Sequence, residues 1–251
     1  MGDQAHVVVY EKNGVKRGID FRPFPGEYGG VDVAAGDFNG DGKDEVVAAN
    51  FTGSNSKIIV YKYNTAREIY ATVTPFGSAS VGATVAAGDV DKDGKAELIV
   101  GASVGGAPRV IVYDVKKNKM IKKPIEFMAF APSSRSGVDV SSGDFDNDGK
   151  DEIVVSQLFY AEARVKVYRY NSQKTILGNF LAYPAGIQCG ANVDAFDIDS
   201  DDKAEVLTGP NMPGAAQIRA FEKNGTSLAN VNFFAYARSL KSGASVVGGW
   251  F

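Results

Sequence analysis

An acidic nine-residue loop occurs four times in this chain, at nearly constant intervals. Its copies begin at Asp37, Asp89, Asp144 and Asp197, so the intervals are 52, 55 and 53 residues. Self-similarity at a period of about 20–50 residues is typical of repeat architectures, in which each copy builds the same supersecondary unit. We therefore expect residues 1–251 to form a single domain, with four repeats that start near residues 31, 83, 138 and 191.

Each loop, numbered from its first aspartate, has oxygen-bearing side chains at positions 1, 3, 5 and 9. With the backbone carbonyl of position 7, they can surround one Ca²⁺ ion with about six to eight oxygens. Mg²⁺ prefers a tighter octahedron with several retained waters, and zinc or copper favours nitrogen or sulfur ligands. The sequence therefore predicts up to four structural Ca²⁺ ions. The predicted ligands are Asp37, Asn39, Asp41, Lys43 and Glu45; Asp89, Asp91, Asp93, Lys95 and Glu97; Asp144, Asp146, Asp148, Lys150 and Glu152; and Asp197, Asp199, Asp201, Lys203 and Glu205, each lysine through its carbonyl.

Two other interpretations of the loops are less favoured. An EF-hand needs a bidentate glutamate at position 12, where these loops have Ala48, Val100, Val155 and Thr208. A single acidic loop would be an ordinary solvated turn, but four copies in register favour a metal. The fourth loop has Asp202 in place of the turn glycine at position 6, which predicts a weaker or more strained site.

The segments around the loops predict four short strands per repeat. A run of small residues precedes each loop, an apolar run follows it, and an alternating strand ending in an aromatic comes next, before a weaker fourth strand. Four antiparallel strands per repeat of about 50 residues are typical of a β-propeller blade. A solenoid would need atypical capping repeats at its ends, which this chain lacks.

The chain ends predict how the ring closes. We expect an all-β, five-bladed propeller whose closing blade is shared between residues 1–30 and 242–251, with a first strand from Ala244 and with Trp250 where the next aspartate would lie. Closure of this kind removes exposed sheet edges. A three-stranded closing blade and a fragment of a larger propeller remain alternatives.

These motifs resemble the FG-GAP, or integrin α-subunit-like, propeller repeat, which is similar to bacterial VCBS-type repeats. Phe76-Gly77 stands at the place of the family's Phe-Gly, and Gly101-Ala102-Ser103 at the place of its Gly-Ala-Pro. The resemblance implies the propeller and its calcium. Such families include adhesion receptors, lectin-like and matrix-binding modules, and non-catalytic domains attached to enzymes. Integrin propellers have seven blades of longer repeats, so ligand recognition by integrins is not carried over.

Composition argues against several functional classes. The net charge is −3 with no basic tract, and no apolar stretch approaches 18 residues, so we expect neither nucleic-acid binding nor membrane insertion. His6 is the only histidine and Cys189 the only cysteine, so neither a catalytic set nor an intrachain disulfide can be assembled. We therefore expect the protein not to be an enzyme.

The loops at the end of the blades opposite the calcium loops differ most between repeats. Such variation on a fixed frame is expected of a recognition surface. We expect a protein or glycan ligand to bind there, although these side chains would alternatively pack between blades. Loops of this kind fill where calcium is millimolar, which predicts an extracellular or cell-surface location, although Met1-Gly2-Asp3-Gln4 begins no signal peptide. An architectural subunit and a lectin-like propeller are alternatives, and the oligomeric state stays open. The predicted anchors are Tyr28, Phe51, Arg135, Phe159, Tyr160 and Met212.

Overall fold

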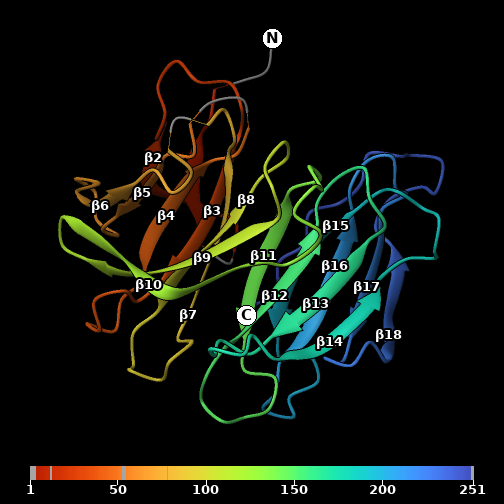
Figure 1. Ribbon diagram of the computed structural model, residues 1–251. Coiled ribbons are helices and arrows are strands. Elements are labelled where there is room, and N and C mark those ends of the chain that lie inside the picture. Colours follow the sequence, from red (N-terminus) through yellow and green to blue (C-terminus); the bar gives the residue numbers. More distant parts are fainter. Residues whose placement is uncertain (1–3, 12, 53–54, 78, 250–251) are drawn as a thin grey trace.

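The computed structural model describes residues 4–11, 13–52, 55–77 and 79–249, in which every helix-or-strand element is a β-strand (Figure 1). Four antiparallel sheets of four strands follow one another along the chain, which confirms the all-β propeller blades. The first blade comprises β3 (Val31–Gly36), β4 (Glu45–Asn50), β5 (Ile58–Tyr61) and β6 (Ile69–Val73). The second comprises β7 (Ala83–Gly88), β8 (Glu97–Ala102), β9 (Arg109–Lys116) and β10 (Lys119–Met128). The third comprises β11 (Val138–Gly143), β12 (Glu152–Gln157), β13 (Arg164–Tyr168) and β14 (Ile176–Leu181). The fourth comprises β15 (Ala191–Phe196), β16 (Glu205–Pro210), β17 (Gln217–Phe221) and β18 (Ser227–Phe234).

The register of each blade places the acidic loop at one end and the variable loop at the other. In the first blade Gly36 pairs with Glu45 beside the acidic loop, and Val31 pairs with Asn50 at the opposite end. The other three blades repeat this register. The predicted assignment of the two loop types to opposite ends is therefore confirmed.

The first strands lie innermost, and β3, β7, β11 and β15 contact one another in turn. Their small residues are a steric requirement. A Cβ added to Gly36 would lie 2.7 Å from the Cβ of Ala87, and one added to Gly143 would lie 3.1 Å from that of Ala195. Larger side chains at these points would push neighbouring blades apart.

The hydrophobic core is divided into layers between blades. Val47 and Ile58 of the first blade pack with Val100 and Tyr113 of the second, and equivalent layers join the second blade to the third and the third to the fourth. Burying one such side chain contributes about 1.5–3 kcal/mol relative to leaving it exposed. Each blade is therefore stabilised mainly by the neighbours that cover its two faces.

Hydrogen bonds from one repeat position add to this packing. The second residue of each inner strand bonds to the backbone of the next inner segment, so the joint recurs around the molecule. Asp32 accepts from Val85 N at 2.8 Å, Thr84 donates to Val138 O at 2.9 Å, Asp139 accepts from Val193 N at 2.9 Å and Asn192 donates to Ala244 O at 3.0 Å.

The chain ends differ from the predicted closing blade. Strands β1 (Val7–Tyr10) and β2 (Lys16–Phe21) form a two-stranded sheet that packs on the first blade. The described part of the predicted C-terminal strand, residues 244–249, forms no strand, and Trp250 lies outside the described residues. A strand needs a paired neighbour, and the second strand of a closing blade is missing from the described residues. Four blades are therefore seen, and no helix of the described part has the length and hydropathy to cross a membrane.

Candidate metal centres

The backbone of each acidic loop is folded around its first aspartate. In the first loop Asp37 Oδ1 accepts from Gly40 N at 2.7 Å, and its Oδ2 accepts from Gly42 N at 2.7 Å. Asp89 and Asp197 accept equivalent bonds in their loops, and Asp144 accepts the one from position 6 together with the N–H of Asp148. The loop turns through left-handed residues at positions 4 and 6 in every copy. The φ values are +78° and +80° at Gly40 and Gly42, +67° and +81° at Lys92 and Gly94, +57° and +81° at Asn147 and Gly149, and +66° and +66° at Ser200 and Asp202.

The glutamate at position 9 lies buried beneath each loop. Its carboxylate accepts the N–H of position 2, at distances between 2.8 and 3.2 Å in the four copies. Burial raises the pKa of Glu97 to about 7, of Glu152 to about 6 and of Glu205 to about 7. Buried carboxylates of this kind are stabilised by a nearby cation, which favours their charged form.

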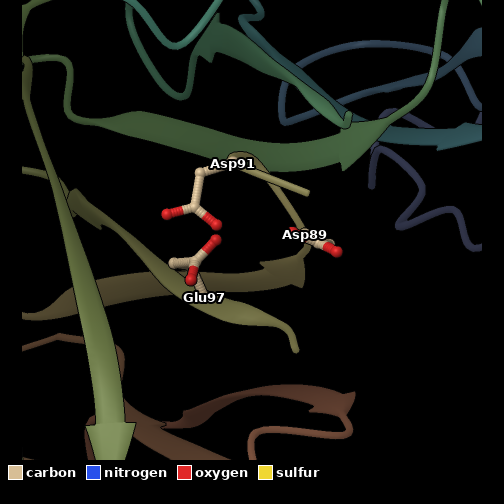
Figure 2. A group of neighbouring side chains, drawn as sticks. All are labelled: Asp89, Asp91 and Glu97. Atoms are coloured by element: carbon tan, nitrogen blue, oxygen red, sulfur yellow. The ribbon is translucent and has the colours of Figure 1, made fainter. Parts of the chain in front are cut away.

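Positions 1, 3 and 9 come together in three of the loops. One carboxylate oxygen from each residue lies within 4.8 Å of the others. Figure 2 shows the second loop, where the carboxylates of Asp91 and Glu97 face one another and Asp89 lies beside them. In the first loop position 3 is Asn39, whose amide donates to Glu45 Oε1 at 2.6 Å. The three groups are Asp89, Asp91 and Glu97; Asp144, Asp146 and Glu152; and Asp197, Asp199 and Glu205.

The donors in these groups fit a hard cation. All are oxygens, and Asp146 Oδ1 is buried without a hydrogen-bond partner among the described residues. Calcium binds oxygen ligands of this kind, and in these loops it would be held by positions 1, 3 and 9.

The aspartates at position 5 do not belong to these three groups, and the predicted ligation through the lysine carbonyls at position 7 stays a prediction. Each position 5 carboxylate accepts the N–H of position 7 at 2.9 or 3.0 Å and is exposed, and the lysine side chains at position 7 are exposed as well. The ligand role of the residues at these two positions stays a prediction. They are Asp41, Asp93, Asp148 and Asp201 at position 5, and Lys43, Lys95, Lys150 and Lys203 at position 7.

Two basic side chains reach the second and third groups and were missed from the sequence. Lys123 Nζ, on β10, lies 2.5 Å from Asp91 and 3.3 Å from Glu97, and Arg169, which follows β13, pairs with Asp146 and lies 3.3 Å from Glu152. By strand register Lys123 is equivalent to Tyr70, Leu177 and Leu228 in the other repeats, so no basic column of the repeat marks it.

Neighbouring loops are also hydrogen-bonded to one another. The N–H of position 8 donates to the carbonyl of position 1 in the preceding repeat. Ala96 N lies 2.9 Å from Asp37 O, Asp151 N 2.9 Å from Asp89 O and Ala204 N 2.8 Å from Asp144 O. The four loops are therefore linked in series along one end of the propeller.

The predicted ligand anchors divide into two sets. Tyr28, Arg135, Tyr160 and Met212 are exposed, and the side chain of Tyr160 is 76% accessible. Phe51 and Phe159 are half-buried. The ring centroids of Phe159 and Tyr160 are 6.1 Å apart.

Comparison with known proteins identifies the repeat. A family model described as the FG-GAP-like repeat matches residues 37–100 and 144–208, just over half of the chain. The chain belongs to the FG-GAP-like repeat family. No curated protein matches it.

Solved structures similar to this FG-GAP protein include three rhamnogalacturonan lyases. The exotype lyase YesX is 14% identical, with a TM-score of 0.51 over 88% of this chain and 42% of the lyase. The lyase YesW is 13% identical, with a TM-score of 0.50 over 90% of this chain and 44% of the lyase. A Bacillus licheniformis lyase is 14% identical, with a TM-score of 0.49 over 90% of this chain and 45% of the lyase. The chain thus spans less than half of each, and the first two likenesses show a shared fold.

Proposed function

We propose that this FG-GAP protein is a calcium-stabilised, non-catalytic β-propeller that binds an extracellular ligand. The observation that carries the metal assignment is the threefold recurrence of Asp, Asp and buried Glu with their oxygens within 4.8 Å. Calcium that binds only the folded chain would stabilise it by mass action.

The non-catalytic role is supported by the environment of the two residues best suited to acid–base or nucleophilic work. His6 lies at the exposed surface paired with Asp20, and Cys189 is buried, where burial raises the pKa of its thiol.

Calorimetry of the metal-free protein tests the metal assignment. Titration with Ca²⁺ should show saturable binding, and the midpoint of thermal unfolding should rise in calcium relative to excess chelator. The variant Asp199→Asn should lose one binding event, whereas Asp44→Asn, at an exposed loop position, should lose none. Identical melting in calcium and chelator would refute the assignment.

We also infer a fifth blade to which both chain ends contribute. The inter-blade bond series continues from Asn192 to Ala244, and the β1–β2 sheet packs on the first blade through Val7 and Phe24. Between these segments a second strand is missing from the described residues, which fits the exposure of Val33. This side chain is 53% accessible, whereas its equivalent Val85 is 5% accessible beneath the preceding blade.

The ligand proposal rests on the exposed anchors Tyr28, Arg135, Tyr160 and Met212. Aromatic and arginine side chains are enriched in binding hot spots, which favours a protein or glycan partner at this end. A glycan and matrix-protein array with Tyr160→Ala as a variant tests it. Loss of a wild-type signal in the variant is expected, and Lys174→Ala, a left-handed turn residue of the opposite end, serves as the control.

An architectural subunit is the second candidate. Exposed apolar residues at the two ends of the blade series favour it, because they could pack against neighbouring copies. Tyr10 on β1 and Val33 on β3 lie at one end, and Phe233 on β18 lies at the other. Analytical ultracentrifugation distinguishes the two candidates. Defined oligomers with a silent array would support the architectural subunit, and a monomer that binds an array ligand would support the ligand-binding module.

A further inference from the structure

A lysine side chain contacts two carboxylates of the metal group in the second acidic loop. Lys123 Nζ lies 2.5 Å from Asp91 Oδ2, 2.8 Å from Asp114 Oδ1 and 3.3 Å from Glu97 Oε1. Its side chain is 12% accessible, so the ammonium group is largely withdrawn from water. Two of the three carboxylates that it contacts belong to the metal group of this loop.

An arginine plays the equivalent part in the third loop. Arg169 pairs with Asp146 and its Nε lies 3.3 Å from Glu152 Oε1, so it too contacts two members of a metal group. The two cations come from different places. Lys123 lies on β10 of the second blade, whereas Arg169 directly follows Tyr168 at the end of β13.

The fourth loop has the opposite charge at the equivalent position. Where Arg169 follows Tyr168, Glu222 follows Phe221 at the end of β17. Lys203 pairs with Asp201 at the exposed rim and reaches no member of the metal group. Among the described residues, no ion pair joins Asp197, Asp199 or Glu205 to a basic side chain.

The first loop carries less negative charge to be compensated than the fourth. Its third position is the neutral Asn39, whose amide donates to Glu45. One fewer carboxylate is present, and the buried glutamate already has a donor beside it.

We propose that Lys123 and Arg169 are internal counter-cations of the second and third loops, so that the calcium requirement of the fold is concentrated in the fourth loop. This inference rests on the calcium binding proposed above. A bound Ca²⁺ in the second or third loop would have to displace a basic side chain or share its carboxylates with it. Like charges within about 4 Å repel strongly where water is scarce, so these two loops bind calcium more weakly.

The left-handed Asp202 does not reverse this ranking. Its φ is +66°, which matches the +66° of Ser200 two residues earlier. Backbone strain that does not change on binding lowers the stability of the fold but leaves the calcium affinity of the folded loop unchanged.

Substitution of the basic side chains tests the proposal. Lys123→Met and Arg169→Met each keep the aliphatic length and remove the charge, and Lys122→Met is the matched control. Lys122 lies on the same strand but is exposed and pairs with Glu126. In titration calorimetry with Ca²⁺, each test variant should gain about tenfold or more in affinity at one site, and the control should match the wild type.

Thermal unfolding in excess chelator gives an independent readout. Lys123→Met should melt about 4 °C or more below Lys122→Met, because its carboxylates lose their cation, and millimolar Ca²⁺ should abolish the difference. Asp199→Asn should remove the tightest calcium site of the wild type.

Three results would overturn the proposal. They are unchanged calcium affinity in both test variants, equal melting of Lys123→Met and Lys122→Met in chelator, and survival of the tightest site in Asp199→Asn. A failure of the calcium assignment itself is distinguishable, because then no variant, the fourth-loop one included, shows any heat of calcium binding.

Discussion

At the scale of single residues, Asp202 shows what the acidic loop demands of its backbone. Position 6 is glycine in three loops, with φ between +80° and +81°, and the aspartate of the fourth loop adopts +66°. This left-handed backbone is the conformation for which strain is predicted at an aspartate. Side chains with a Cβ pay a steric cost there that glycine avoids.

Asp202→Gly should therefore stabilise the protein. We expect the free energy of unfolding to rise by about 0.5–1 kcal/mol in chelator, measured by urea denaturation. The reciprocal variant Gly94→Asp is the control, because a Cβ there meets nothing within 4 Å and reports the backbone alone. It should lose a similar amount, and a gain for Gly94→Asp would contradict the explanation.

At the scale of elements, the inner strands are joined by one polar column. Thr84 of the second blade is fully buried and donates to the carbonyl of Val138 in the neighbouring third blade. Thr84→Val keeps the shape but leaves that carbonyl without its donor, which should cost about 1–3 kcal/mol in unfolding free energy. Thr84→Ser retains the hydroxyl and should cost less. Equal losses of unfolding free energy in both variants would show that the packing of Thr84, rather than its hydrogen bond, accounts for the stabilisation.

Asp32 of the same column predicts a pH dependence. Burial raises the pKa of Asp32 to about 6, from a usual value of 3.8. As the pH rises from about 4 to 6 the unfolded chain releases this proton first, so stability falls across that window and then levels off. Burial also raises the pKa of Asp139, and the charge of Asp32 adds to this rise.

Asp32→Asn should flatten that profile. Its amide oxygen can still accept from Val85 N, and no carboxylate must ionise in the folded state. We expect a gain of about 1–2 kcal/mol at pH 7 and no gain near pH 3.5, measured by urea denaturation across the pH range. Asp44→Asn, an exposed substitution, is the control. An equal effect of Asp32→Asn at both pH values would argue against the raised pKa.

The sequence predicts the blades better than it predicts the surroundings of the metal groups. The loop period and the apolar second strands depend on local pattern, and the structure confirms both. By strand register Lys123 corresponds to Tyr70, Leu177 and Leu228, and Arg169 corresponds to Lys62, Asp114 and Glu222, so no repeat signal marks either. The predicted strand from Ala244 was wrong in the described residues, because strand formation depends on a partner as well as on the strand's own sequence.

At the scale of the whole molecule, the C-terminal segment covers the last inner strand. Ala244 N donates to Pro210 O at 2.7 Å, and Gly248 N donates to Asp194 Oδ2 at 2.7 Å. Deleting residues 243–251 should lower the melting temperature by about 4 °C or more, since it removes these bonds and uncovers β15. The control is Val247→Asn, whose side chain is 83% accessible and should leave melting unchanged. A deletion that melts like the wild type would argue against the inferred fifth blade.

The polar column also bears on how such a molecule can change its size. Each repeat presents a side chain on one flank, at Asp32, Thr84, Asp139 or Asn192, and a bare backbone acceptor or donor on the other. The receiving group is an N–H for Asp32 and Asp139 and a carbonyl for Thr84 and Asn192, and main chain supplies both kinds whatever the side chains of the receiving segment. Duplication or loss of one repeat would therefore join two blades whose inner strands can still form this hydrogen bond, without any further substitution. The number of blades can change in this way while the hydrogen bond between neighbouring blades is kept.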